Sequence, residues 1–289
     1  TVNSLFEGLS SLDGFVFLDS SDLSSRYSKY SFMAFTPFLE FESKEGVTSL
    51  SYRCGKIEAS DENPFNLLRR YIRQYTHSSE DDRVPVLGGA IGYIGYSASH
   101  YLDDFDTVLK ASDIPDVLFG FYDYWVVIDH EKSVLWWVSL DSGEGIKPVS
   151  FLYELCDKGH SLYHNSSCQI KDLNPMWSYS EYKKAFDQVY AYIESGDTYQ
   201  VNLSYPFSAY FEGNLAIVYS QLRDITKMPF SVYMNWKTVQ ILSSSPERFF
   251  SLNGCFVETN PIKGTIRRDS NSKIDQQLQK ELMTSVKNR

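Results

Sequence analysis

Residues 122–140 of the chain read YDYWVVIDHEKSVLWWVSL. Two runs of β-branched and aromatic residues, 122–128 and 134–140, stand on either side of the polar stretch 129–132. Side chains of this kind pack well on a pleated surface, and a short polar stretch between two such runs is typical of a turn. The sequence therefore predicts two strands joined by a turn in this part of the chain.

The residues before this stretch carry both strand and helix signals. Aromatic and β-branched runs at 15–18 and 30–35, separated by Ser, Asp, Pro and Gly, predict strands and hairpins. After Asn63 and Pro64, apolar residues recur at the spacing of an amphipathic helix, and proline is favoured where a helix begins. The apolar positions are Phe65, Leu68, Tyr71, Ile72 and Tyr75.

A glycine-rich stretch at 87–96, LGGAIGYIGY, has some likeness to a dinucleotide-binding loop. It lacks the spacing of that motif and the preceding strand of a βαβ unit. We interpret it as a strand whose glycines let a neighbouring backbone approach closely.

The second half of the chain opens with the clearest helical signal. Ser178 and Glu181 form a capping box, and an apolar stripe continues to Gly196. The following residues 198–205 alternate strictly between apolar and polar side chains, which predicts a strand. Further along, we predict a helix at 215–225 and strands at 230–236, 239–244 and 255–258.

The junction between the two halves is less regular. A weak helical pattern at 148–158 is followed by a polar stretch at 159–175 that has no periodicity, which predicts a linker or a long surface loop. We place the domain boundary here, between an N-terminal α+β region at 1–170 and a second region at 171–289.

Composition restricts the classes of function. The chain has 289 residues, of which 43% are apolar, and its net charge of −10 argues against a nucleic acid or an anionic membrane as the main partner. No apolar run reaches the roughly 18 to 20 residues that span a bilayer, and the four cysteines lack the spacing of a metal site. We expect a cytoplasmic protein with reduced thiols.

Two segments place ionisable side chains among turn residues just after predicted strands. In SSSPERF, residues 243–249, Glu247 follows a proline at a strand end and suits a general acid, although a solvated Glu247-Arg248 turn explains the same residues. In ETNPIKGT, residues 258–265, Lys263 suits a nucleophile if it is desolvated, although an ordinary surface lysine is the simpler alternative. Gly264 and Thr265 could then bind a substrate carboxylate.

Taken together, these segments resemble the chorismate-utilising enzymes, a family that includes the anthranilate, aminodeoxychorismate, isochorismate and salicylate synthases. The resemblance rests on three ordered segments: 195–204 (SGDTYQVNLS), 245–249 (SPERF), and Thr259 with 261–265 (PIKGT). Weaker similarity extends through 88–96 and 121–123 toward the first strands. The resemblance implies an α+β sandwich of antiparallel sheets with outer helices.

Within the family, the residue before the Gly-Thr pair differs between branches. Anthranilate synthases typically have alanine there, whereas the aminodeoxychorismate synthases of folate and p-aminobenzoate biosynthesis have lysine, as this chain has at Lys263. The resemblance implies that Lys263 attacks C2 of chorismate while Glu247 protonates the departing C4 hydroxyl, after which ammonia adds at C4. It also implies that Gly264, Thr265 and Gln200 contact the substrate.

The resemblance also implies partners. A glutamine amidotransferase subunit supplies ammonia in the family, and many members bind tryptophan near the first strands. Leu18, Asp19 and Ser20 match one tryptophan-contact motif, and Pro229 and Phe230 end the second. The second motif usually reads Asn-Pro-x-Pro-aromatic, and this chain departs from it at its first two positions.

Family members continue well past the position that matches residue 289, and the resemblance assigns the Mg²⁺ ligands to that later part. We therefore expect a fold that is incomplete at its C-terminus, no metal ligand in this chain, and neither a closed core nor turnover of chorismate by the chain alone. Two other readings stay open. One is an anthranilate, isochorismate or salicylate synthase, and the other is a noncatalytic fragment that senses tryptophan or docks a partner.

Overall fold

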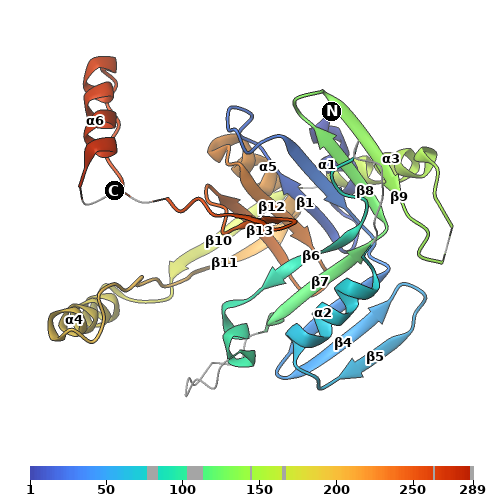
Figure 1. Ribbon diagram of the computed structural model, residues 1–289, viewed down its shortest axis with the longest axis horizontal. Helices are drawn as coiled ribbons and strands as arrows, with labels where there is room; N and C mark the ends of the chain where they lie inside the picture. The colour runs from blue at the N-terminus through green and yellow to red at the C-terminus, as the bar shows by residue number, and fades with distance from the viewer. Residues whose placement is uncertain (77–83, 103–112, 144, 165–166, 263, 287–289) are drawn as a thin grey trace.

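The computed structural model describes residues 1–76, 84–102, 113–143, 145–164, 167–262 and 264–286. Two antiparallel sheets pack face to face, and helices cover both outer faces (Figure 1). Helices α1 (Val2–Leu9), α3 (Val149–His164) and α5 (Leu215–Thr226) cover the first sheet. Helix α2 (Pro64–Gln74) and the short 3-10 helix η1 (Tyr96–Tyr101) cover the second. The expected α+β sandwich with outer helices is confirmed.

The strand order of both sheets mixes segments that are distant in the chain. The six-stranded sheet has the order β13 (Gln240–Ser245), β12 (Phe230–Asn235), β1 (Phe15–Asp19), β2 (Tyr30–Ala34), β8 (Tyr124–Asp129) and β9 (Val134–Ser139). The five-stranded sheet has the order β5 (Ile57–Ser60), β4 (Val47–Tyr52), β3 (Leu39–Lys44), β7 (Val117–Tyr122) and β6 (Gly89–Ile94). Every neighbouring pair is antiparallel.

Side-chain alternation along β1 explains the layers. Phe15 and Phe17 belong to the apolar cluster beneath α1, α3 and α5, whereas Val16 belongs to the cluster between the two sheets. Successive residues of a strand point to opposite faces, so a strand that is apolar on both sides is buried on both sides. The six-stranded sheet is therefore the middle of the core.

The predicted hairpin forms between β8 and β9, but its first strand begins later than predicted. Tyr122 ends β7 in one sheet and Tyr124 begins β8 in the other, so the chain changes sheets at Asp123. The buried carboxylate of Asp123 accepts hydrogen bonds from Arg53 at 2.6 and 3.1 Å, which secures this corner. The apolar pattern runs unbroken across the corner, and that is why the sequence did not reveal it.

Two local predictions in the first half are confirmed. The helix predicted after Asn63 and Pro64 is α2, and Asn63 caps it, with its side chain accepting from the backbone N–H of Phe65. The glycine-rich stretch forms β6, and a Cβ atom added at Gly92 would lie 1.9 Å from the carbonyl oxygen of Leu118. Close approach of the neighbouring strand thus requires glycine at that position.

In the second half of the chain, the helices predicted up to Gly196 and at 215–225 are confirmed, and two other predictions are wrong. Helix α4 (Tyr179–Ser195) has the predicted capping box, and it ends at Gly196 in the left-handed conformation. The predicted linker is wrong, because α3 extends to His164 and β10 (Cys168–Pro175) pairs with β11 (Phe207–Gly213).

The predicted strand at 198–205 is also wrong. No strand of the described chain pairs with these residues. They therefore lack the hydrogen bonds to a neighbouring strand that an alternating segment needs in order to form a β-strand. The predicted boundary near residue 170 does not separate the sheets, since β12 pairs with β1.

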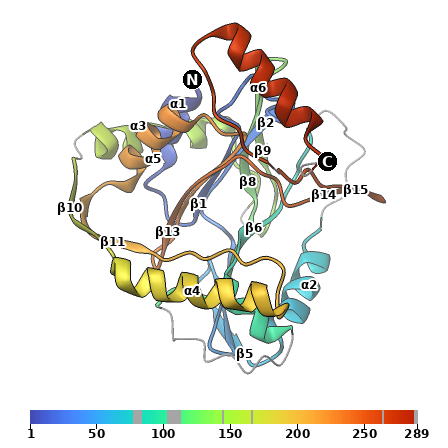
Figure 2. The ribbon, with the colours of Figure 1, turned by 90° about the vertical axis from the view of Figure 1, so that its left-hand side faces the viewer.

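Several elements of the second half lie outside the sandwich. Helix α4 stands away from the sheets and lies nearest the viewer in Figure 2, and α6 (Ser272–Thr284) projects from another part of the molecule. Neither helix, both fully described, buries a residue. The chain exposes 19215 Å², whereas a folded monomer of 33.3 kDa exposes about 12,600 Å² by the scaling of surface with mass.

The exposed apolar surface of α4 and of the last strands should be detectable in solution. The purified chain is expected to bind an apolar fluorescent dye strongly at neutral pH, because Phe186, Tyr190 and Ile193 of α4 are exposed together with Phe249 and Phe256. Dye fluorescence during a urea titration measures this. A signal that rises only on unfolding would contradict the prediction. A purified monomer with a closed core measured under the same conditions is the control.

Candidate functional site

The turn that carries Glu247 is held at the end of a strand. Ser245 ends β13, and its Oγ donates a hydrogen bond to the carbonyl oxygen of Glu247 at 3.0 Å. The backbone N–H of Glu247 donates to the same Oγ at 3.3 Å. The Glu247 side chain is exposed. The sheet thus positions the backbone of this residue and leaves its carboxyl group accessible.

A hairpin brings the second chemical segment beside this turn. Strands β14 (Ser251–Asn253) and β15 (Phe256–Glu258) pair antiparallel, with Ser251 opposite Glu258. Beyond the ladder, Thr259 Oγ1 donates to the carbonyl oxygen of Phe249 at 2.8 Å. The predicted strand at 255–258 is confirmed over 256–258, but its pairing with 251–253 was not foreseen. Two of the three family-like segments therefore lie side by side.

The remaining predicted substrate contacts are dispersed. Lys263 lies outside the described residues. Gly264 has a φ of 77°, a left-handed conformation that glycine adopts without strain, and both Gly264 and Thr265 are exposed. Gln200 is exposed in the segment after α4, and none of the described hydrogen bonds joins that segment to the β14–β15 hairpin.

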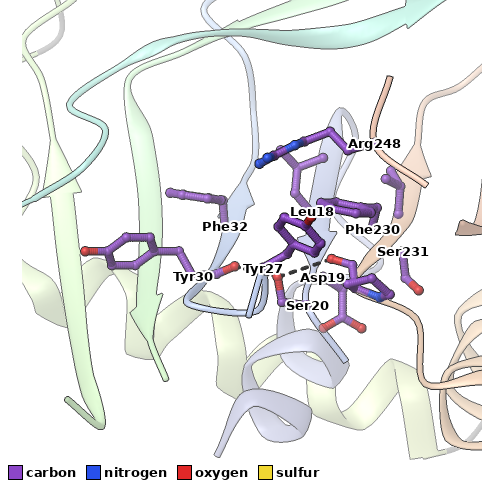
Figure 3. A pocket seen from close by; sticks show the side chains of 11 residues that line it. Leu18, Asp19, Ser20, Tyr27, Tyr30, Phe32, Phe230, Ser231 and Arg248 are labelled. Carbon is purple, nitrogen blue, oxygen red and sulfur yellow. Dashed lines mark hydrogen bonds between the residues drawn. The ribbon is translucent and has the colours of Figure 1, made fainter. Parts of the chain in front are cut away.

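A separate cavity of about 300 Å³ lies where β1 ends and where β2 and β12 begin, at the ends of central strands of the six-stranded sheet (Figure 3). Its wall includes all five residues that the resemblance assigns to tryptophan contact: Leu18, Asp19, Ser20, Pro229 and Phe230. The wall is completed by Tyr27, Tyr30, Phe32, Ser231, Val232 and Arg248. Two segments more than 200 residues apart thus meet at one concave surface.

Hydrogen bonds from Ser20 and Ser21 hold these segments together. Ser20 Oγ donates to the carbonyl oxygens of Tyr30 and Pro229, at 2.8 and 3.4 Å (Figure 3). The backbone N–H of Ser21 donates to the carbonyl oxygen of Met228 at 3.2 Å. Ser20 Oγ has one proton, which the carbonyl oxygens of Tyr30 and Pro229 share, and the hydroxyl thus links the start of β2 to the residue before β12.

Asp19, which lines the cavity, also joins it to helix α5. Its fully buried carboxylate accepts hydrogen bonds from Arg223 Nε at 2.5 Å and from the Tyr219 hydroxyl at 3.2 Å, both on α5. These bonds tie β1 to α5 and leave the carboxylate engaged within the protein. Burial raises the pKa of Asp19 above its ordinary value, and the hydrogen bond and positive charge of Arg223 oppose this only in part.

A pH dependence of stability follows from this carboxyl group. The folded chain retains the Asp19 proton to a higher pH than the unfolded chain does, so the free energy of unfolding should fall as pH rises from about 3.8 through the folded pKa and then level off. Urea unfolding of the wild type and of Asp19→Asn across this range measures the difference. A difference that grows with pH in favour of the wild type would contradict the assignment.

Arg248 is the residue whose role the sequence did not reveal. Its guanidinium carbon lies 5.0 Å from the ring centroid of Tyr27 and 5.6 Å from that of Phe230, at the edge of the cavity. From the sequence, Arg248 is only a neighbour of Glu247 in a surface turn. No local pattern marks its role, because its partners Tyr27, Phe230 and Glu258 lie at least ten residues away in the chain.

The described residues do not fit a magnesium site. They contain no group of three or more His, Cys, Asp or Glu side chains that could hold a metal ion. No chemical step at this site is therefore assigned to a metal. Among the described helices, none is long and apolar enough to cross a membrane.

Comparisons with known proteins bear on this geometry. A family model described as chorismate binding enzyme matches residues 15–289. Aminodeoxychorismate synthase component 1 of Salmonella typhimurium is 28% identical over 94% of the chain and 59% of its own length. The Escherichia coli protein of that name is also 28% identical, over 98% of the chain and 62% of its length. The chain thus spans about three fifths of these relatives.

Anthranilate synthases are similar as well. Component 1 from Methanothermobacter thermautotrophicus is 25% identical over 98% of the chain and 58% of its own length. The crystal structure of anthranilate synthase component I from Streptococcus pneumoniae superposes with a TM-score of 0.67 at 24% identity, covering 92% of the chain and 59% of that structure. This last likeness supports the fold.

Proposed function

The chain belongs to the chorismate binding enzymes, and from this we propose that it forms the part of an aminodeoxychorismate synthase component 1 that carries the general acid and the nucleophile. The reaction converts chorismate and ammonia into 4-amino-4-deoxychorismate and water, a step toward p-aminobenzoate and folate. The observation that supports the proposal is the hairpin that joins the Glu247 turn to residues 258–262. Thr259 Oγ1 donates to the carbonyl oxygen of Phe249, two residues after Glu247, so this turn and the segment that follows β15 are in contact.

The proposed chemistry balances in two steps. The neutral amine of Lys263 attacks C2 of chorismate, both ring double bonds shift by one position, and the C4 hydroxyl leaves as water with a proton from Glu247. Ammonia then adds at C4, both double bonds shift back, and the Lys263 amine leaves C2. The surplus proton of the bound ammonia returns to Glu247, so that the acid is restored.

Lys263 is the residue that favours amination at C4 over anthranilate formation. Anthranilate synthases typically have alanine at the matching position. A covalent route needs the amine that Lys263 supplies. The ammonia would come from a glutamine amidotransferase subunit or from free ammonium. Gly264, Thr265 and Gln200 remain proposed substrate contacts, and Mg²⁺ remains a proposed cofactor held by residues other than the described ones.

Product analysis tests the proposal. We expect no turnover by the chain alone, because α4 and the hairpin lack covering structure. We expect 4-amino-4-deoxychorismate from a chimera in which the unmatched C-terminal portion of the Escherichia coli relative follows this chain, when chorismate, ammonium and Mg²⁺ are supplied. Mass spectrometry separates the outcomes, because this product retains the pyruvyl ether and anthranilate has lost it. Anthranilate, or no product from a chimera that melts cooperatively, would overturn the proposal.

Glu247→Gln in the same chimera is expected to lower the turnover number by about 10²- to 10⁴-fold, because an amide cannot protonate the departing hydroxyl. The steady-state rate measures this. Glu281→Gln, on the exposed face of α6, is the matched control and should leave the rate unchanged. An unaltered rate in Glu247→Gln would remove this residue from the mechanism.

The cavity supports a second function for the same chain, the binding of tryptophan. Aromatic rings of Tyr27 and Phe230 line it, and Arg248 Nε is buried without a hydrogen-bond partner among the described residues. An amino-acid carboxylate would supply that partner. Calorimetry with tryptophan tests this candidate. Heat of binding in the wild type that is lost in Phe230→Ala supports it, and no binding by the wild type refutes it.

A further inference from the structure

Arg248 connects three parts of the molecule that the proposed reaction needs in fixed positions. It follows Glu247 directly in the chain, and its Nη2 donates to Glu258 Oε2 of β15 at 2.6 Å. Its guanidinium also faces the rings of Tyr27, in the turn before β2, and Phe230, the first residue of β12 in the six-stranded sheet. One side chain thus contacts the sheet, the hairpin and, through the backbone, the acid turn.

The rest of this turn has few other supports. Ser245 holds Glu247 only through local hydrogen bonds, and residues 246–250 form no strand. Phe249 is 85% exposed, so apolar burial does not anchor the turn there. Only about a quarter of the Arg248 side chain is exposed, which makes it the least exposed residue between 246 and 250. The turn is therefore held to the hairpin at two points, by the hydrogen bond from Thr259 Oγ1 to the carbonyl oxygen of Phe249 and by the docked side chain of Arg248.

The chemistry of this contact suits arginine and no other cation. A planar guanidinium can lie against aromatic rings while its N–H groups donate in the plane to a carboxylate, whereas an ammonium group acts as a hydrated point charge. The side chain of Asn260 and the charge of Arg248 lower the pKa of Glu258, so the acceptor stays ionised. Both contacts therefore persist at neutral pH.

We propose that Arg248 is a positioning residue that clamps the Glu247 turn onto the β14–β15 hairpin, so that the general acid and the 258–265 segment meet the substrate in one geometry. This rests on the proposed function of Glu247. The clamp acts on the rate of the chemical step, since misplacing an acid affects the transition state more than the bound substrate.

Steady-state kinetics of the chimera, with three variants, test the clamp. Arg248→Met keeps the length of the stem and removes the guanidinium, and it should lower kcat at least tenfold with less than a twofold change in the KM for chorismate. Arg248→Lys should recover only part of this loss. Arg268→Met removes an exposed arginine that pairs with Asp275 at 2.8 Å and is the matched control, expected to leave both constants unchanged. Equal kcat in Arg248→Met and wild type would overturn the proposal.

A second measurement separates failure of the clamp from failure of the proposed reaction. Hydrogen exchange of the 289-residue chain without the added C-terminal portion should be faster at residues 247–250 in Arg248→Met than in wild type or Arg268→Met. If the wild-type chimera makes no product, the proposed function fails and exchange alone decides on the clamp. Exchange that is the same in all three proteins would refute the clamp even if the reaction is confirmed.

Discussion

Asp19→Ala is expected to lower the free energy of unfolding by about 3–5 kcal/mol, a large part of the stability of a single domain. The substitution leaves the guanidinium of Arg223 in the interior, with only 18% of that side chain exposed and its main partner removed. The hydroxyl of Tyr219 also loses its acceptor at the same time. A buried charge without its partner costs far more than the intact pair contributes.

Urea unfolding at neutral pH measures this effect, and the chain offers a matched control. Lys237 pairs with Asp13 at 2.8 Å on the surface, where the lysine is 80% exposed. Lys237→Ala should cost no more than about 1 kcal/mol, since exposed ion pairs contribute little. Equal losses in the two variants would show that Asp19 and Arg223 are not the buried tie between β1 and α5.

Lys263→Ala is expected to lower formation of 4-amino-4-deoxychorismate by the chimera about 10³-fold or more, because the variant has no amine to attack C2. A second readout is covalent. The wild-type chimera, given chorismate without ammonium, should gain the mass of chorismate less one water, and the variant should not.

Lys273→Ala is the control for this experiment, because it removes another lysine of the same region from an exposed helix. It should keep both the turnover and the covalent adduct. Turnover of Lys263→Ala at the wild-type rate would exclude the covalent route. An adduct that persists in Lys263→Ala would assign the attack to a different nucleophile.

Local signals in the sequence predicted most of the elements correctly. The capping box at Ser178, the cap at Asn63 and the glycine at 196 act within one turn of their own helix, so they need no distant partner. The aromatic and β-branched run at 15–18 likewise predicted β1, which is buried on both faces. Residues 198–205 alternate strictly between apolar and polar side chains and still form no strand, since a strand also needs a neighbour.

The candidate site was predicted in parts. The sequence pointed to Glu247 at a strand end, and β13 does end at Ser245. The family resemblance assigned both residues 18–20 and residues 229–230 to tryptophan contact, and both segments line one cavity. The inward position of Arg248 and the engagement of Asp19 by Arg223 were missed, because each depends on a partner at least ten residues away.

By itself, the sequence determined helices α2, α4 and α5, the capping box of α4, the strands that are apolar on both faces, and the family to which the chain is similar. Each of these follows from residue types at short separations. Only the tertiary structure decided the change of sheet at Asp123, the pairing of β12 with β1, the cavity between them and the contacts of Arg248. These features arise when segments distant in the chain bury surface against each other, and such contacts leave no periodic trace in either segment.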